Sequence, residues 1–201
     1  MTIKNIARGA LAAMAALSLA ACGINSVPAA EETAKAKWAD VEAQFQRRAN
    51  LIPNLVEVAQ GAAENERSIL TEVTEARARA TSVNVSADDL NDPAKMENFA
   101  AAQGQLGQGI GRLLASFEAY PQIQSNQNYI ALQSQLEGTE NRIAVAIRDY
   151  NEAVRQYNTT IRTFPDTIGA NIIHGAEPMV PYSAVTEGAE VAPSIDMTSG
   201  D

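Results

Sequence analysis

The residue types that most often carry catalysis are scarce in this chain. His174 is the only histidine and Cys22 is the only cysteine among the 201 residues. A zinc site built from nitrogen and sulfur ligands needs three or four of them, and a di-iron helical protein needs a Glu-x-x-His pair on each of two helices. The serines lack a histidine base in the helical region, and the motif Gly-x-Ser-x-Gly does not occur. We therefore predict no metal, no cofactor and no catalytic residues.

Two other patterns that could do chemistry have plainer explanations. The chain contains 24 acidic residues, but carboxylates on amphipathic helices more often face solvent than form acid–base pairs. Glycines follow one another closely at positions 104, 107, 109 and 111. Their spacing differs from the phosphate-binding Gly-x-Gly-x-x-Gly, and no Lys-Ser or Lys-Thr follows. Close approach of two helices explains the glycines better.

The thiol of Cys22 is the one group whose surroundings predict a reaction. A positively charged start leads into an apolar run over residues 10–21, which is too short for a bilayer because a spanning helix needs about twenty residues. The run ends Leu-Ala-Ala-Cys, which resembles the bacterial lipobox. There the sulfur takes a diacylglycerol, the chain is cut before the cysteine, and the new amine is acylated, for example with palmitate. We predict a lipoprotein signal peptide over residues 1–21; an ordinary secretory signal or a short signal anchor is the alternative.

Lipid at Cys22 would anchor the protein to a membrane. Three acyl chains hold far more firmly than one, and residues 22–30 would form a short tether. Because Cys22 is the only cysteine, no disulfide can form within the chain. We expect the protein in the bacterial cell envelope. Gly23 after the cysteine resembles a sorting pattern for the periplasmic face of the outer membrane; otherwise the lipid would lie in the outer face of the plasma membrane.

Residues 125–165 have the strongest helical pattern of the chain. Apolar residues recur every seven positions and at the three- and four-residue steps between, which places them on one stripe of a helix. Ser125 or Asn126 is expected to cap its start, and Pro165 to end it. At roughly 1.5 Å per residue the helix is about 57 Å long, so other helices must cover the stripe. The stripe consists of Tyr129, Leu132, Leu136, Ile143, Ile147, Tyr150, Val154, Tyr157 and Ile161.

Three arginines also recur every seven residues on this stretch, at Arg148, Arg155 and Arg162. Their spacing places them along one line of the helix. One interpretation is a rim of salt bridges with acids on a neighbouring helix. The other is a positive groove for an acidic segment of a partner protein. On that second interpretation the three arginines are the candidate partner-binding surface.

Upstream, a helical pattern runs from Glu31 to Ser82 and is interrupted by Pro53. Its apolar positions include Trp38, the only tryptophan, which we predict to be a core residue. A single helix over this span would reach about 78 Å, longer than its partners. We therefore predict a break at Pro53, with Asn50 as the cap of a second helix, in preference to a kink.

Two further boundaries complete the plan of elements. Asp92 followed by proline is a strong helix start, and the third helix is predicted to run to Tyr120. After Pro165 the helical periodicity disappears, and no lysine or arginine follows. We predict a largely disordered C-terminal tail over residues 166–201, with residues 168–173 packing back on the helices.

Three stretches resemble the LemA family, in the same order. They are FQRRANLIPNLVEVAQGAAENE (45–66), GRLLASFEAYPQIQSNQNYIALQ (111–133) and EGTENRIAVAIRDYNEAVRQYNTTIRTFP (137–165). The resemblance covers roughly residues 38–165. It implies an all-α fold, an antiparallel up-and-down four-helix bundle of long helices over residues 31–165 with a flexible C-terminal tail, held at a bacterial membrane by its N-terminus. Family members more often begin with a transmembrane helix, which a lipid would replace here. The resemblance brings no activity, because the molecular role of the family is not established.

The charge balance narrows the possible partners. The net charge is −9, and removal of residues 1–21 takes away Lys4 and Arg8, which leaves about −11. Phosphates would be repelled, so we predict no nucleic-acid binding and no broad adhesion to anionic lipid. We expect a non-catalytic helical scaffold, tethered to a membrane, that binds an envelope protein. The alternative is an uncatalogued envelope hydrolase or a lipoprotein that binds a small ligand.

Overall fold

A computed structural model describes the backbone of residues 3–60 and 67–184, and the side chains of residues 25–59 and 67–184. This part of the chain is helical and contains no strand, so the all-α prediction is confirmed for it. The long helices are α1 (Ile3–Gln60), α2 (Arg67–Ser82), α3 (Pro93–Ser116) and α5 (Gln127–Thr160). The short helical pieces are η2 (Ala87–Asp89), η3 (Phe117–Ala119), α4 (Pro121–Gln124), α6 (Asp166–Gly169) and the π-helical turn η4 (Ala170–His174).

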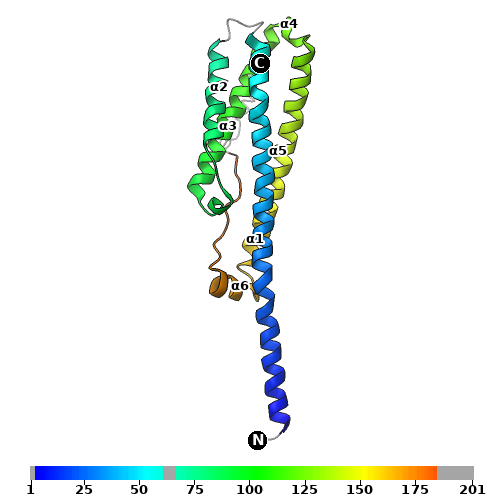
Figure 1. Cartoon of the computed structure of the whole chain (residues 1–201), viewed down its shortest axis with the longest axis vertical. Helices are drawn as coiled ribbons and strands as arrows, with labels where there is room; N and C mark the ends of the chain where they lie inside the picture. Colours follow the sequence, from blue (N-terminus) through cyan, green and yellow to red (C-terminus); the bar gives the residue numbers. More distant parts are fainter. Residues whose placement is uncertain (1–2, 61–66, 185–201) are drawn as a thin grey trace, which may run out of the picture.

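The long helices lie roughly parallel to one axis, with neighbours running in opposite directions (Figure 1). α1 packs against α5 along most of the length of α5 and also contacts α2, and α2 packs against α3. α6 lies beside α1 at the end of the helical domain, and the first residues of α1 project beyond it (Figure 1). The N-terminal part of α1 therefore emerges from the end of the helical domain at which α6 lies (Figure 1).

The predicted break at Pro53 is wrong, because α1 continues through this residue to Gln60. Proline has no backbone N–H, so the carbonyl of Ala49, four residues earlier, loses its helical partner. Arg77 of α2 replaces that partner, since its Nε donates a hydrogen bond to the Ala49 carbonyl at 2.8 Å. The chain reverses later, between the end of α1 at Gln60 and the start of α2 at Arg67 (Figure 1). The helical pattern from Glu31 to Ser82 is therefore divided there, and no single helix has to span it.

The helix starts follow the predicted capping. The Asn126 side chain accepts a hydrogen bond from the amide of Asn128 at 2.9 Å, and Asp92 accepts one from the amide of Ala94 at 2.9 Å. α5 ends at Thr160, ahead of the predicted stop at the proline. The predicted stripe is confirmed, since its members are buried except for Ile147, which is partly buried.

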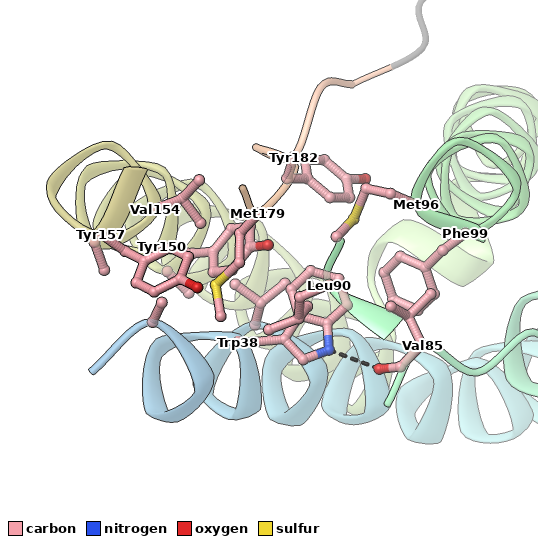
Figure 2. Packing of buried hydrophobic residues seen from close by; sticks show 14 of the residues in the cluster. Trp38, Val85, Leu90, Met96, Phe99, Tyr150, Val154, Tyr157, Met179 and Tyr182 are labelled. Carbon is pink, nitrogen blue, oxygen red and sulfur yellow. Dashed lines mark hydrogen bonds between the residues drawn. The ribbon is translucent and has the colours of Figure 1, made fainter. Parts of the chain in front are cut away.

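Two apolar clusters fill the helical domain. The Trp38 cluster occupies the half nearer α6, and its aromatic rings pack edge to face, with 5.3 Å between the centroids of Trp38 and Phe99. The Trp38 indole also donates a hydrogen bond to the carbonyl of Val85 at 2.7 Å (Figure 2), so the prediction of a core tryptophan is confirmed. The Phe117 cluster occupies the other half and includes Ile52, Leu55, Val73, Leu106, Leu113, Phe117, Ile123 and Tyr129.

Two predictions about the ends of the chain need correction. The expected tether is part of α1, and Val27 within it is fully buried in the Trp38 cluster. The tail is ordered through residues 175–184, where Met179 and Tyr182 are buried. The expectation of disorder for residues 185–201 concerns residues outside those described. The packing of residues 168–173 is confirmed in part, because Gly169 and Ala170 are buried against α1 while the three isoleucines of this segment are exposed.

Candidate interaction surface and buried polar layer

Arg148 and Arg155 of the predicted surface lie on the outer face of α5, whereas Arg162 lies two residues beyond its end, in the turn that follows. The side chains of Arg148 and Arg155 are 73% and 67% exposed, and Arg162 is exposed as well. Their acidic partners are on α5 itself: Arg148 contacts Asp149 at 3.3 Å, and Arg155 contacts Glu152 with two nitrogens. The Arg155 guanidinium lowers the pKa of the Glu152 carboxyl to about 2. In the described part of the chain, the ion pairs of Arg148 and Arg155 stay within α5, so a salt-bridged rim against a neighbouring helix is not what the structure contains.

A shallow groove runs beside the lower part of this row. Arg155 and Arg162 line it together with Pro181 of the C-terminal segment. Asn158, Thr159 and Thr163 also belong to its lining. The groove offers positive charge together with hydrogen-bonding groups, as a site for an acidic segment requires.

The C-terminal segment, residues 176–182, is held against α5 as an extended strap. Two Tyr-Asn pairs seven residues apart bind its backbone. Asn158 donates to the carbonyl of Met179 at 2.8 Å and accepts from its amide at 2.9 Å, and Asn151 makes the same pair of bonds to Tyr182 at 2.9 and 2.8 Å. The hydroxyls of the pairs also donate to strap carbonyls, from Tyr150 to Val180 at 2.8 Å and from Tyr157 to Glu177 at 3.0 Å.

The side chains of the strap close the Trp38 cluster (Figure 2). Met179 and Tyr182 point inward, and the Tyr182 ring lies 5.8 Å from Phe45 and 6.4 Å from Phe99, centroid to centroid. Burial raises the pKa of the Tyr182 hydroxyl to about 12, so this side chain stays neutral at physiological pH. The amide of Val180 donates to the Leu90 carbonyl at 2.8 Å, which ties the strap to the loop before α3.

We expect Asn151→Ala combined with Asn158→Ala to release the strap while the long helices stay folded. Four hydrogen bonds to the strap backbone would be lost, each worth about 1 kcal/mol, so the amides of Met179 and Tyr182 should exchange about 1,000 times faster. Hydrogen–deuterium exchange measures this. Asn50→Ala is the control, because Asn50 is exposed on α1 and its side chain accepts a hydrogen bond from Gln46 of the same helix. Unchanged exchange in the double variant would mean that apolar packing alone holds the strap.

A buried polar layer separates the two apolar clusters. Its centre is Arg48 of α1, which is 4% exposed. The Arg48 guanidinium donates to the carbonyl and side-chain oxygen of Gln103 on α3, at 2.9 and 2.8 Å, and contacts Glu140 of α5 at 3.2 Å. It also lies 5.0 Å from the centre of the Phe45 ring. Thr139 completes the layer, fully buried, with its hydroxyl bonded to the carbonyl of Gln135 on its own helix.

Sequence reasoning missed both the polar layer and the strap contacts, although each has a signal. Apolar residues of α1 occupy positions 38, 41, 45, 52, 55 and 59, in alternating steps of three and four apart from one gap, and Arg48 fills the gap. A charged residue at a core position of a helix indicates a buried partner. The repeat Tyr-Asn at 150–151 and 157–158 places an amide beside a core residue twice at the same heptad spacing.

The remaining candidates add little to the site. The backbone of Cys22 is part of α1, and its side chain falls outside the described part of the structure. His174 ends η4, away from the polar layer in sequence. Among the described residues no three His, Cys, Asp or Glu side chains are grouped so that they could hold a metal ion. Within the same residues, no helix combines the length and apolar character that crossing a bilayer requires.

The fold and these surfaces define an all-helical protein whose distinctive features are contact surfaces and a packed polar layer. The chain belongs to the LemA family, because the sequence model of that family matches residues 37–197. The match extends through the strap, beyond the stretch in which the resemblance was visible in the sequence.

Three curated relatives carry the name magnetosome protein. MamQ 1 and MamQ 2 of Paramagnetospirillum magneticum are each 30% identical over 145 residues, which is 64% of this chain and 53% of the relative. MamQ of Magnetospirillum gryphiswaldense is 30% identical over 136 residues, 60% of this chain and 50% of the relative. The chain thus spans about half the length of the curated relatives that it matches.

Proposed function

We propose that this chain is a non-catalytic, lipid-anchored protein of the bacterial cell envelope, a helical scaffold that binds other envelope proteins. In this proposal α1, α2, α3 and α5 form one antiparallel up-and-down four-helix bundle. The alternating directions of neighbouring helices and the packing of α1 on α5 and of α2 on α3 support that arrangement. The relatives, magnetosome proteins of two bacterial genera, support a bacterial setting.

The observation that carries the proposal is the row of exposed arginines on α5 and the turn after it. Arg148 and Arg155 share one line of α5 and pair with acids of the same helix, and Arg162 is exposed two residues past the end of that helix. Exposed pairs of this kind add little stability. These positive charges lie on a chain whose net charge is −9. Such a surface speeds association with an acidic partner more than it strengthens the complex.

Crosslinking in intact cells tests the surface. We expect Arg148→Glu combined with Arg155→Glu to lose most of the partner that the wild type captures, and capture by the wild type to weaken in high salt. The control is Arg47→Glu combined with Arg67→Glu, which makes the same change of charge at exposed sites on α1 and α2. If the folded double variant captures the same partner as the wild type, the row has only a structural role. Turnover of an envelope substrate by the purified protein would contradict the scaffold itself.

The anchor is proposed to be lipid on Cys22 after removal of residues 1–21. We expect metabolic labelling with palmitate to mark the wild type and to miss Cys22→Ser, because only a thiol at this position takes the diacylglycerol. N-terminal analysis of the mature protein should find a blocked cysteine. Equal labelling of both proteins, or a mature chain that begins elsewhere, would contradict lipidation.

A further inference from the structure

An apolar patch lies exposed at the end of the helical domain from which the N-terminal part of α1 emerges. Phe164 and Ile172 are 70% and 78% exposed, and Ile168 and Ile173 are also exposed. Ile168 and Ile172 are spaced by four residues, which places them on one side of α6 and η4, and Phe164 lies in the turn just before α6. The opposite side, with Gly169 and Ala170, is buried against α1. Single exposed apolar residues are ordinary, but four within ten residues usually mark a contact surface.

This patch is fixed close to the proposed anchor. The hydroxyl of Ser26 on α1 donates to the Asp166 carboxylate at the start of α6, at 2.7 Å. Cys22 precedes Ser26 by one helical turn, which is about 6 Å along the axis. Val27, in the next position, is buried in the same cluster as Ala170. α6 and η4 therefore lie within about one helical turn of the residue that would carry the acyl chains.

The composition of the patch fits the interfacial layer of a bilayer. From Thr163 to Ala176 the only ionisable side chains are Asp166 and His174, and the Asp166 carboxylate is turned toward Ser26. Aliphatic residues and phenylalanine enter the boundary between headgroups and acyl chains to a depth of roughly 5–10 Å. Because the patch has no lysine or arginine, such contact would be driven by apolar burial and would not depend on anionic lipid.

We infer that Phe164, Ile168, Ile172 and Ile173 insert into the membrane interface and orient the helical domain on the bilayer that holds the lipid anchor. This inference rests on the proposed anchor at Cys22. The lipid alone would tether the domain with free rotation. Two attachments, the acyl chains and the patch, fix α1 in a defined direction and keep the arginine row of α5 at a constant height above the surface.

Fluorescence in vesicles tests this inference with full-length lipidated protein reconstituted in phosphatidylethanolamine and phosphatidylglycerol. Ile172→Trp adds a reporter to the patch, and Ile130→Trp is the matched control, because Ile130 is also an exposed isoleucine but lies in the first turn of α5 at the opposite end. The native Trp38 is buried and about 18 Å farther along α1 than Ser26, so it gives a constant background.

With brominated acyl chains, we expect the added tryptophan at position 172 to lose about half of its emission, and the one at position 130 to lose none. High salt should leave the quenching unchanged. If the protein floats with the vesicles but shows no quenching at position 172, the inference is wrong and the lipid anchor is still supported. Crosslinking of position 172 between two chains would then show that the patch joins copies of the protein instead. Protein that does not float overturns both the anchor and the inference.

Discussion

Ile143→Asp is expected to unfold the helical domain. Ile143 lies in the middle of the buried stripe of α5, is only 5% exposed and belongs to the Trp38 cluster. The substitution removes packed methyl groups and places a carboxylate among the apolar side chains of the cluster. The two effects together should cost more than about 3 kcal/mol, a large part of the roughly 5–15 kcal/mol that keeps a domain of this kind folded.

Thermal melts followed by circular dichroism measure this effect against Gln156→Asp. Gln156 is exposed on the outer face of the same helix and donates to Glu152 at 2.9 Å. Its replacement adds the same chemical group and brings it near another acid one turn away, at a cost of only a few tenths of a kcal/mol. Similar melting temperatures for the two variants would show that the stripe is assigned to the wrong face.

The parts of the fold that sequence predicts well are those fixed by local chemistry. The stripe of α5 follows from a repeat of three and four residues, and the starts of α3 and α5 follow from side chains that accept hydrogen bonds from amides two residues away. Neither inference needs a distant part of the chain, and for that reason both hold in the structure.

The misprediction at Pro53 has the opposite origin. A proline inside a helix breaks it when the freed carbonyl finds no donor. Here the donor is Arg77, 28 residues away on another helix, and no local pattern indicates that it would come to Ala49. The strap is a similar case. Residues 176–182 have no helical period, yet amides and hydroxyls of α5 bind their backbone at Glu177, Met179, Val180 and Tyr182. A segment without periodicity is therefore not the same as a segment without partners.

The candidate site likewise has one part that local sequence predicts, the arginine row, and one part that depends on packing between helices, the polar layer. The arginine row was predicted because residues at heptad spacing share a line on one helix. The structure keeps all three arginines exposed, although α5 ends before Arg162. The polar layer forms only where α1, α3 and α5 pack together, at the level of Arg48. Sequence could have marked Arg48 as a charged residue at a core position, but Gln103 and Glu140 are identified as its partners only once α3 and α5 lie beside α1.

The polar layer leads to the second large effect. Glu140→Ala should destabilise the protein by about 2–3 kcal/mol, because it leaves the buried Arg48 guanidinium without a carboxylate. The Nε of Arg48 is already buried without an acceptor in the described part of the chain, so the layer has no spare hydrogen bond with which to compensate. Since the Glu140 side chain is half exposed, the expected cost lies below that of breaking a fully buried pair.

Adding Arg48→Met to Glu140→Ala should recover most of this loss. A methionine fills the space of the aliphatic stem between the Trp38 and Phe117 clusters and carries no charge that needs a partner. Urea denaturation of the two single variants and the double variant gives the coupling energy, with Glu137→Ala as the control because Glu137 is exposed one turn earlier on α5 and bonds to Gln133. A double variant at least as unstable as Glu140→Ala would contradict a cost that arises from the unpaired guanidinium. In that case the hydrogen bonds of Arg48 to Gln103, which join α1 to α3, would be the contribution that the helical domain cannot lose.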